Sequence, residues 1–183
     1  MKIGDYTVYA PFLADDGLSE AEAWGAAVWS WMASPRHYEA PLRALARLLL
    51  PLIKQKQYVI ALRDNQPCFF LSWGMLSEEA EAAYLRDADE SVLYEQLRSG
   101  DRLWIFDWIT PFGDSRAMAS LITTDIFPHH CLRSLYHKGA ERGRRVMEFS
   151  GAQVSRQQAA EWRAEHPFVL RGKVGRNTQD TEL

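Results

Sequence analysis

The segment from Trp104 to Ile109 sets one carboxylate, Asp107, inside a run that is otherwise typical of a buried strand. An unpaired carboxylate in an apolar interior is strongly destabilising, so Asp107 requires a fixed partner or a chemical role. Pro111 and Gly113 follow in a Thr-Pro-Phe-Gly sequence that favours a turn. Asp107 is therefore expected near a strand end, where functional sites are often built.

A second candidate is His37, which lies in the sequence Ser34-Pro-Arg-His-Tyr38 between two expected helices. Imidazole, with an ordinary pKa of roughly 6.5, accepts a proton near neutral pH, and a carboxylate on its second ring nitrogen fixes its tautomer. His37 and Asp107 could form such a general-base pair. The residues alone leave the alternative open that His37 is an ordinary surface histidine and Asp107 a buried aspartate with satisfied hydrogen bonds.

A competing set of chemically active side chains consists of His129, His130, Cys131 and His137. Histidine and cysteine are zinc ligands, but adjacent side chains on a helix diverge by about 100°, and positions seven apart lie about 10.5 Å apart. Cys131 also lacks a defined orienting group for a nucleophile. We therefore expect no metal site.

Several local patterns predict which elements must position these residues. Ser19 and Glu22 form a capping-box pattern, which predicts a helix over about 20–33. A second helix is expected from Pro41, with a core stripe formed by Leu42, Leu45, Leu49 and Leu52. The remaining elements are expected to be a hairpin of strands 58–62 and 68–73, an acidic helical region 77–98, a strand around Asp107, helices 115–125, 129–137 and 155–165, and a strand 144–150.

This order of elements implies an α+β domain with a mixed central sheet and helices on its faces. Strict alternation along the central strand places Asp107 on one face with Leu103, Ile105 and Ile109. The other face then carries Trp104, Phe106 and Trp108.

Composition limits the class of protein. The 183 residues, 47% hydrophobic, can build one sizeable core. Two cysteines predict a reduced compartment without disulfides, and the absence of a secretory pattern or a long apolar run predicts a cytoplasmic protein without a transmembrane segment.

Charge divides the chain unevenly, although its net charge is only -3. Residues 1–128 hold 11 Lys/Arg against 18 Asp/Glu, and residues 129–183 hold 10 against 6, giving -7 and +4. The basic part favours an acidic partner, although a solvated charged face is the alternative. Nucleic acid is not expected, because the whole chain is acidic and no aromatic-interleaved basic motif is present.

Several motifs, in this order, resemble the toxin-activating lysine acyltransferases that mature RTX haemolysins and related pore-forming toxins. The resemblance spans about residues 24–165. The motifs are Trp29-Ser-Trp-Met-Ala-Ser-Pro-Arg-His37, Gln57-Tyr58, Arg63-Asp64, Ser72-Trp73, Ser99-Gly-Asp-Arg102, Phe106-Asp-Trp-Ile-Thr-Pro-Phe-Gly-Asp114, Phe127-Pro128 and Glu148-Phe149.

The resemblance implies that His37 and Asp107 are the catalytic pair and that Ser34 supports the histidine. It further implies a fold similar to the GNAT acetyltransferases, which we expect as a single domain over residues 19–171 after an N-terminal extension (1–18). Residues 172–183 are polar with little apolar content, so a flexible tail is expected there. The implied function is transfer of a fatty acyl chain from acyl-acyl carrier protein to lysines of an RTX protoxin by a protein that is commonly a homodimer.

Three features depart from the family pattern: the extension, Thr110 in place of the usual alanine, and Ser150-Gly-Ala in place of the usual His-Gly-Gly. No convincing glycine-rich pyrophosphate loop is present, so no bound cofactor is expected. The basic stretch, with Arg133, Lys138, Arg142, Arg144 and Arg145, is the expected dock for the acidic carrier protein. A non-enzymatic adaptor that contacts the toxin through Trp24, Trp29 and Trp31 is the alternative function.

Overall fold

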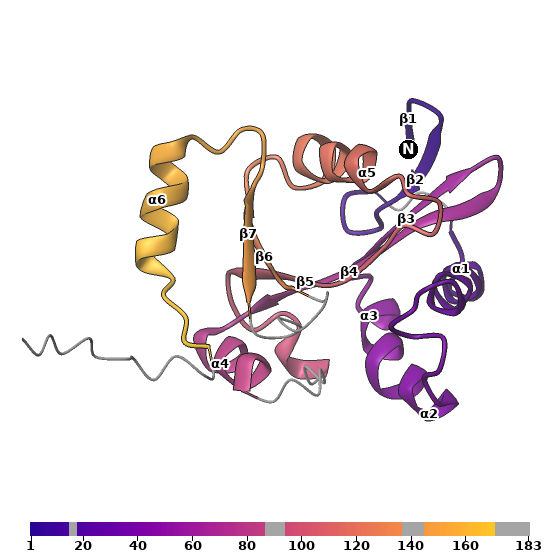
Figure 1. Ribbon diagram of the computed structural model, residues 1–183, viewed down its shortest axis with the longest axis horizontal. Helices are drawn as coiled ribbons and strands as arrows, with labels where there is room; N and C mark the ends of the chain where they lie inside the picture. Colours follow the sequence, from indigo (N-terminus) through magenta and orange to yellow (C-terminus); the bar gives the residue numbers. More distant parts are fainter. Residues whose placement is uncertain (15–17, 87–93, 137–144, 171–183) are drawn as a thin grey trace, which may run out of the picture.

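The computed structural model describes residues 1–14, 18–86, 94–136 and 145–170 (Figure 1). Within them, one seven-stranded sheet follows the chain order from β1 to β7. Its strands are β1 (Lys2–Ile3), β2 (Tyr6–Tyr9), β3 (Tyr58–Arg63), β4 (Gln66–Leu76), β5 (Arg102–Ile109), β6 (Cys131–Leu135) and β7 (Val146–Ser150). The described strands pair antiparallel except β5 with β6, which are parallel. The mixed α+β prediction is confirmed, and the arrangement is consistent with a GNAT-like fold.

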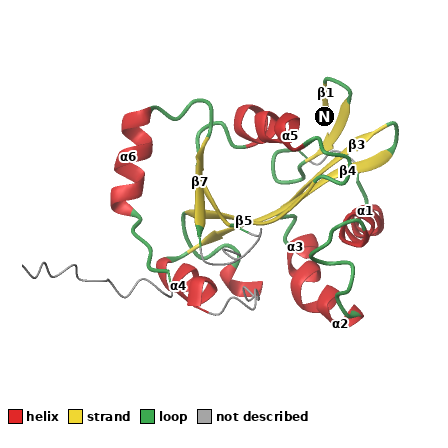
Figure 2. Ribbon diagram, in the orientation of Figure 1, coloured by secondary structure: helices red, strands yellow, loops and turns green. Residues whose placement is uncertain are grey.

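Helices cover both faces of this sheet (Figures 1 and 2). The α-helices are α1 (Glu20–Met32), α2 (Leu42–Ala44), α3 (Leu50–Lys54), α4 (Glu78–Arg86), α5 (Ser115–Leu121) and α6 (Arg156–Glu165). Two π-helical turns, η1 (Leu45–Leu49) and η3 (Ile122–Ile126), and a 3₁₀ turn, η2 (Tyr94–Gln96), complete the set. α1 and α3 pack with β3 and β4 on one face, and α5 with η3 packs on the other.

The predicted capping box of α1 is present, since Ser19 and Glu22 bond to each other's backbone N–H groups. The second helical region begins at Leu42, as expected, but its leucine stripe is only partly core. Leu49 and Leu52 are buried, whereas Leu42 is 83% exposed. The π-helical turn between them explains the difference, because its extra residue per turn shifts the register of side chains on either side.

The hairpin of β3 and β4 is also confirmed. Its turn residues Asp64 and Asn65 have φ values of 52° and 61°. Two consecutive left-handed residues match the twist of the flanking strands, so this turn directs β4 back along β3. The pairing places Ser72 opposite Tyr58 on one side and Asp107 on the other.

The helix predicted over 129–137 is wrong. Cys131–Leu135 is the strand β6, which lies between β5 and β7. Leu132 and Leu135 have a helical spacing in sequence, but backbone pairing on both edges of β6 outweighs this weak local preference. Residues 2–9, within the segment interpreted from sequence as an extension, contribute β1 and β2 to the same sheet.

Candidate active site

The site begins with an irregularity in β5. In the β4–β5 ladder Ser72 pairs with Asp107 and Trp73 pairs with Ile105, so Phe106 is an extra residue on β5. Such a β-bulge turns the residues that follow it to the opposite face of the strand. Asp107 consequently lies on the face covered by α1–α3.

The bulge corrects the alternation expected from sequence. Leu103, Ile105 and Trp108 belong to the core on the α5 face, and Ile109 belongs to the core under α1. Asp107 therefore does not share a face with Leu103 and Ile105 as predicted. The period of two fails at Phe106 because a bulge has no local sequence signature in this strand.

His37 is brought to Asp107 by the turns that end α1. Ser34 N donates to Trp31 O, and His37 N donates to Ser34 O at 2.9 Å. The imidazole stacks on the Trp31 ring with centroids 4.5 Å apart. Its Nε2 lies 3.2 Å from Asp107 Oδ1, although 70 residues separate the two in sequence. The juxtaposition expected from sequence is present, and His37 is a buried rather than a surface residue.

Two serines complete the hydrogen bonds of the pair. Ser34 Oγ lies 2.9 Å from His37 Nδ1, and Ser72 Oγ donates to Asp107 Oδ2 at 2.5 Å. Because an ionised carboxylate can only accept, a neutral His37 carries its proton on Nε2, and its Nδ1 accepts from Ser34. The resulting chain runs from Ser34 through His37 and Asp107 to Ser72. Sequence reasoning missed Ser72, because its place depends on the register between β4 and β5.

The electrostatics keep Asp107 ionised. Burial by itself raises the pKa of this carboxyl, but the hydrogen bond and charge of His37, the charge of Arg36 and the bond from Ser72 outweigh it. The net pKa of Asp107 lies below its ordinary value of 3.8. Arg36, also missed by sequence reasoning, donates from Nη1 to Phe106 O at 3.0 Å, which ties the cation to the bulge.

A small cavity of about 30 Å³ adjoins the pair. It is lined by Trp31, Arg36, His37, Leu48, Pro51, Leu52, Tyr84, Leu97, Phe106 and Asp107. This volume suits a single small polar group such as one amine or one water. The arrangement can therefore remove or donate a proton at a reacting group that enters from the surface.

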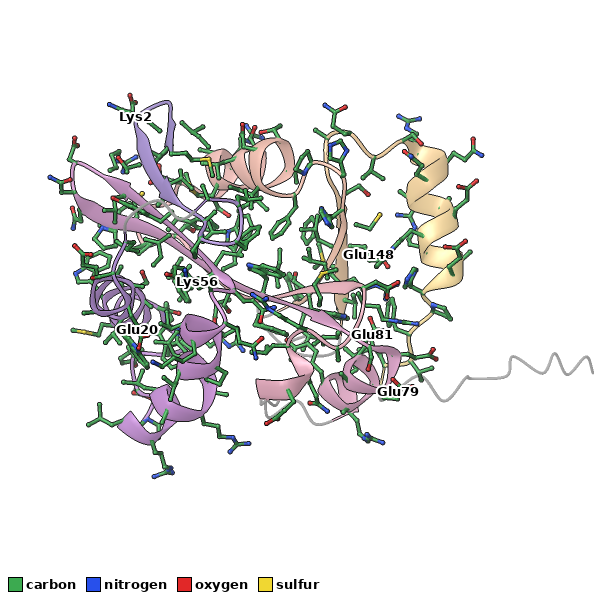
Figure 3. The ribbon with its side chains drawn as sticks, turned by 180° about the vertical axis from the view of Figure 1, so that it is seen from behind. Lys2, Glu20, Lys56, Glu79, Glu81 and Glu148 are labelled. Carbon is green, nitrogen blue, oxygen red and sulfur yellow. The ribbon has the colours of Figure 1, made fainter. Side chains whose placement is uncertain are left out.

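The predicted docking residues differ in their exposure to solvent. Arg133 is 1% exposed and cannot contact a partner protein, which corrects its assignment. Its guanidinium bonds to Glu81 Oε1 at 2.8 Å and Glu148 Oε1 at 3.2 Å (labelled in Figure 3). It also lies 4.6 Å from the ring centroids of Trp162 and Phe168. Arg145 is exposed, and Lys138, Arg142 and Arg144 lie outside the described residues.

The zinc alternative gains no support in the part of the chain that the structure describes, where no group of three or more possible ligands occurs. His137 lies outside those residues, and Cys131 begins a strand rather than a helix. Both Cys68 and Cys131 are free thiols, as expected from sequence.

Comparison with known proteins identifies the family. The sequence model of the HlyC group, the RTX toxin acyltransferase family, matches residues 17–150. The chain belongs to this family. It is 36% identical over 153 residues to the RTX-I toxin-activating lysine-acyltransferase ApxIC of Actinobacillus pleuropneumoniae, covering 84% of this chain and 88% of the relative.

Two further relatives of this RTX toxin acyltransferase are similar over most of their length. The leukotoxin-activating lysine-acyltransferase LtxC of Aggregatibacter actinomycetemcomitans is 37% identical over 81% of this chain and 88% of its own. The protein-lysine myristoyltransferase HlyC of Escherichia coli is 37% identical over 75% of this chain and 80% of its own. Membership of the family makes this chain an acyltransferase. Among its described helices, none has the length and hydropathy needed to cross a membrane.

Proposed function

We propose that this protein transfers a fatty acyl chain from acyl-acyl carrier protein to the ε-amino group of lysines in an RTX protoxin and so activates the toxin. The observation that carries the proposal is the His37 Nε2 to Asp107 Oδ1 contact of 3.2 Å beside a small cavity, in a chain of this family. The names of the relatives, lysine-acyltransferases that activate RTX toxins, support the choice of acceptor.

The proposed mechanism begins with the acceptor. A lysine has an ordinary pKa of about 10.4, so its amine must lose a proton before it can attack a thioester. His37 accepts that proton, and Asp107 stabilises the imidazolium that results. Because Nε2 already donates to Asp107, the accepting nitrogen is Nδ1, and the Ser34 hydroxyl lies next to it at 2.9 Å.

The neutral amine then forms a bond to the thioester carbonyl carbon, and the carbon–sulfur bond breaks. The carrier thiolate takes a proton from the imidazolium and leaves as a thiol, which returns His37 to its neutral form. The imidazole then takes the second proton from the nitrogen of the new amide and passes it to solvent, so the overall reaction converts an ammonium and a thioester into an amide, a thiol and one released proton. The Ser34 hydroxyl can act as donor or acceptor, which lets it bond to His37 Nδ1 before and after proton transfer. Direct transfer requires no bound cofactor.

The donor, compartment and assembly form part of the proposal. Carrier proteins are strongly acidic, and the basic stretch that includes Arg142, Arg144 and Arg145 complements them. Because carrier protein and unsecreted protoxin occur in the cytoplasm, we place the reaction there. We further propose a homodimer, as the family resemblance implies.

The adaptor alternative depends on exposed tryptophans, and the structure weakens it. Trp31 is 3% exposed, and Trp24 and Trp29 are only partly exposed. Trp31 packs on His37 and belongs to the core under α1. These aromatics therefore offer little free surface for a toxin.

The two functions separate in one reconstituted assay. The protein, acyl carrier protein charged with a fatty acyl chain and the protoxin are mixed. Mass spectrometry of toxin peptides then measures the acyl groups added to lysine. The enzyme adds acyl mass, and His37→Ala lowers the rate by roughly 100-fold or more, as loss of a general base does. The exposed His129 serves as a matched control, because His129→Ala leaves the rate unchanged. Toxin binding without acylation would establish the adaptor instead.

A further inference from the structure

A basic helical segment forms part of the wall of the cavity beside the catalytic pair. Residues 42–54 run through α2, η1 and α3 without a break, and we call them the basic helix. Leu49 and Ile53 on its inner side pack in the core cluster that also holds Trp31 of α1. Figure 1 shows α2 and α3 beside α1. Between residues 40 and 62 the sequence contains no Asp or Glu but four cations, Arg43, Arg47, Lys54 and Lys56.

The basic helix also frames the mouth of this cavity. Six of the ten lining residues are buried, among them His37 and Asp107. The other four are partly exposed and therefore mark the mouth: Arg36, Leu48, Pro51 and Phe106. Leu48 and Pro51 belong to the basic helix. An amine that enters the cavity from the surface therefore passes this helix.

Two arginines of the basic helix form a row that leads to the mouth. Positions four apart lie on the same side of a helix, and the π-helical turn η1 keeps this relationship. Arg43, Arg47 and Pro51 are spaced in this way, so the row begins at Arg43 and ends at Pro51. Both arginines are exposed. Arg36 places a further cation at the mouth itself.

Neighbouring charges set the limits of this cationic surface. Lys54 Nζ lies 2.8 Å from Glu20 Oε1, so a carboxylate of α1 compensates its charge. The exposed Arg98 donates from Nη2 to Gln55 O at 2.5 Å, which adds a cation beside the end of α3. The carboxylate nearest to the basic helix in sequence is that of Glu39, which precedes α2.

These charges affect the approach of a lysine. An ammonium that approaches over Arg43 and Arg47 meets charges of its own sign, so its approach is unfavourable unless its own chain supplies carboxylates. Arg47 lies about 6 Å and Arg43 about 12 Å along the helix from Pro51, at about 1.5 Å of rise per residue. An extended chain advances about 3.3–3.6 Å per residue, so carboxylates about two and about four positions from the lysine reach these arginines.

We infer that the basic helix binds the segment of the protein substrate that carries the acceptor lysine and selects lysines with acidic residues about two to four positions away. This inference rests on the proposed function. Arg43 and Arg47 contact the carboxylates, and the lysine side chain enters the cavity past Leu48 and Pro51. Leu42, which is 83% exposed, offers an apolar contact at the far end of the row.

An anionic membrane surface would meet the same charges. The position of the row favours the protein substrate, because the row ends at the mouth of the cavity that holds His37 and Asp107. A substrate lysine has to reach this mouth, whereas a lipid headgroup does not.

Two double charge reversals supply a matched test. Arg43→Glu with Arg47→Glu changes the net charge by the same amount as Arg156→Glu with Arg163→Glu, and all four arginines are exposed. Arg156 and Arg163 belong to α6, which lies on the opposite side of the molecule from α2 and α3 (Figure 2).

Two synthetic nonapeptides probe the sequence around the lysine. Each has one central lysine, with either glutamate or glutamine at the second and fourth positions on both sides. Their binding to wild type and to both double variants is measured by fluorescence anisotropy at low and high salt. Acylation of the protoxin gives kcat and KM for the same three proteins, and sedimentation measures their binding to phosphatidylglycerol vesicles.

Wild type is expected to bind the glutamate peptide about tenfold more tightly than the glutamine peptide at low salt, and the difference should shrink as salt rises. Reversal of Arg43 and Arg47 abolishes this preference and raises KM for the protoxin by about tenfold. Its kcat changes by less than about twofold, because neither arginine contacts the reacting atoms. Reversal of Arg156 and Arg163 leaves the peptide preference, kcat and KM unchanged.

Equal affinity of wild type for the two peptides at low salt would overturn the inference. Equal effects of the two double reversals would do the same, since net charge alone would then explain them. Loss of vesicle binding with an unchanged KM for the protoxin would make the basic helix a membrane surface instead. If wild type acylates no protoxin, the proposed function fails by itself, and the peptide preference still decides whether the basic helix binds acidic segments.

Discussion

Ser72 and Asp107 lie directly opposite each other on β4 and β5, and Ser72 Oγ donates to Asp107 Oδ2 at 2.5 Å. The bulge at Phe106 begins at this pair, so the same register step that turns Asp107 toward His37 also gives it a fixed donor. Ser72 thus acts on His37 through the carboxylate and is a positioning residue rather than a catalytic one.

Ser72→Ala is expected to destabilise the fold by about 1–3 kcal/mol, because a buried carboxylate oxygen loses its donor. The pKa of Asp107 rises, since one of the bonds that lower it is gone. Urea unfolding measures the first effect and the acid limb of the rate profile the second. Ser72→Thr keeps the hydroxyl and should restore the profile; failure of this rescue would assign Ser72 a packing role only.

Asp107→Asn tests the ionised carboxylate through pH. Because the folded pKa of Asp107 lies below 3.8, its ionisation stabilises the fold above that value, and this contribution is lost as pH falls through the folded pKa. Wild type should therefore lose more unfolding free energy than Asp107→Asn between about pH 5 and about pH 3. If the unfolding free energies of wild type and Asp107→Asn fell in parallel over that range, the pKa of Asp107 would not be lowered in the folded protein.

Ser34→Ala separates two roles for the serine. If the proton reaches His37 Nδ1 through the hydroxyl, Ser34→Ala lowers the acylation rate by about tenfold to 100-fold, and Ser34→Thr retains most of it. Stability falls by about 1–3 kcal/mol, because the buried Nδ1 of His37 loses its hydrogen-bond donor. An unchanged rate with Ser34→Ala would show that the amine proton reaches His37 directly.

Glu81 anchors a buried network on α4. It is 2% exposed and accepts from Arg102, Arg133 and Trp104, which joins α4 to β5 and β6. Glu81→Ala leaves two buried guanidinium groups without this partner. The free energy of unfolding, measured in urea, should therefore fall by about 3–5 kcal/mol. The exposed Glu79 on the same helix is the control, and Glu79→Ala should change stability little.

Reversing the charge of three arginines tests whether the basic stretch binds the acyl donor. Arg142→Glu, Arg144→Glu and Arg145→Glu together should weaken binding of acyl-carrier protein by about tenfold or more at low salt, and the difference should shrink as salt rises. Binding is measured by calorimetry at two ionic strengths. Equal affinity of wild type and the triple variant at low salt would remove the basic stretch from the donor interface.

Much of the secondary structure and the identity of the catalytic candidates followed from sequence. The capping box at Ser19, the turn at Asp64 and Asn65 and the apolar run around Asp107 are local signals, since each depends on residues a few positions apart. The motifs containing His37 and Asp107 indicate the family from the order of their residues alone. A charge in a buried strand was sufficient to predict a partner for Asp107.

Contacts between distant segments decided the rest. The face of Asp107 depends on a one-residue bulge, and Ser72 meets it only through strand register. Arg133 is buried because Glu81 of α4 and the rings of Trp162 and Phe168, all distant in sequence, pack against its guanidinium. β6 pairs with β5 only as far as Ile105, although β5 continues to Ile109. Local sequence encodes propensity and polarity, whereas bulges, register and strand divergence are set by the free energy of packing the whole sheet.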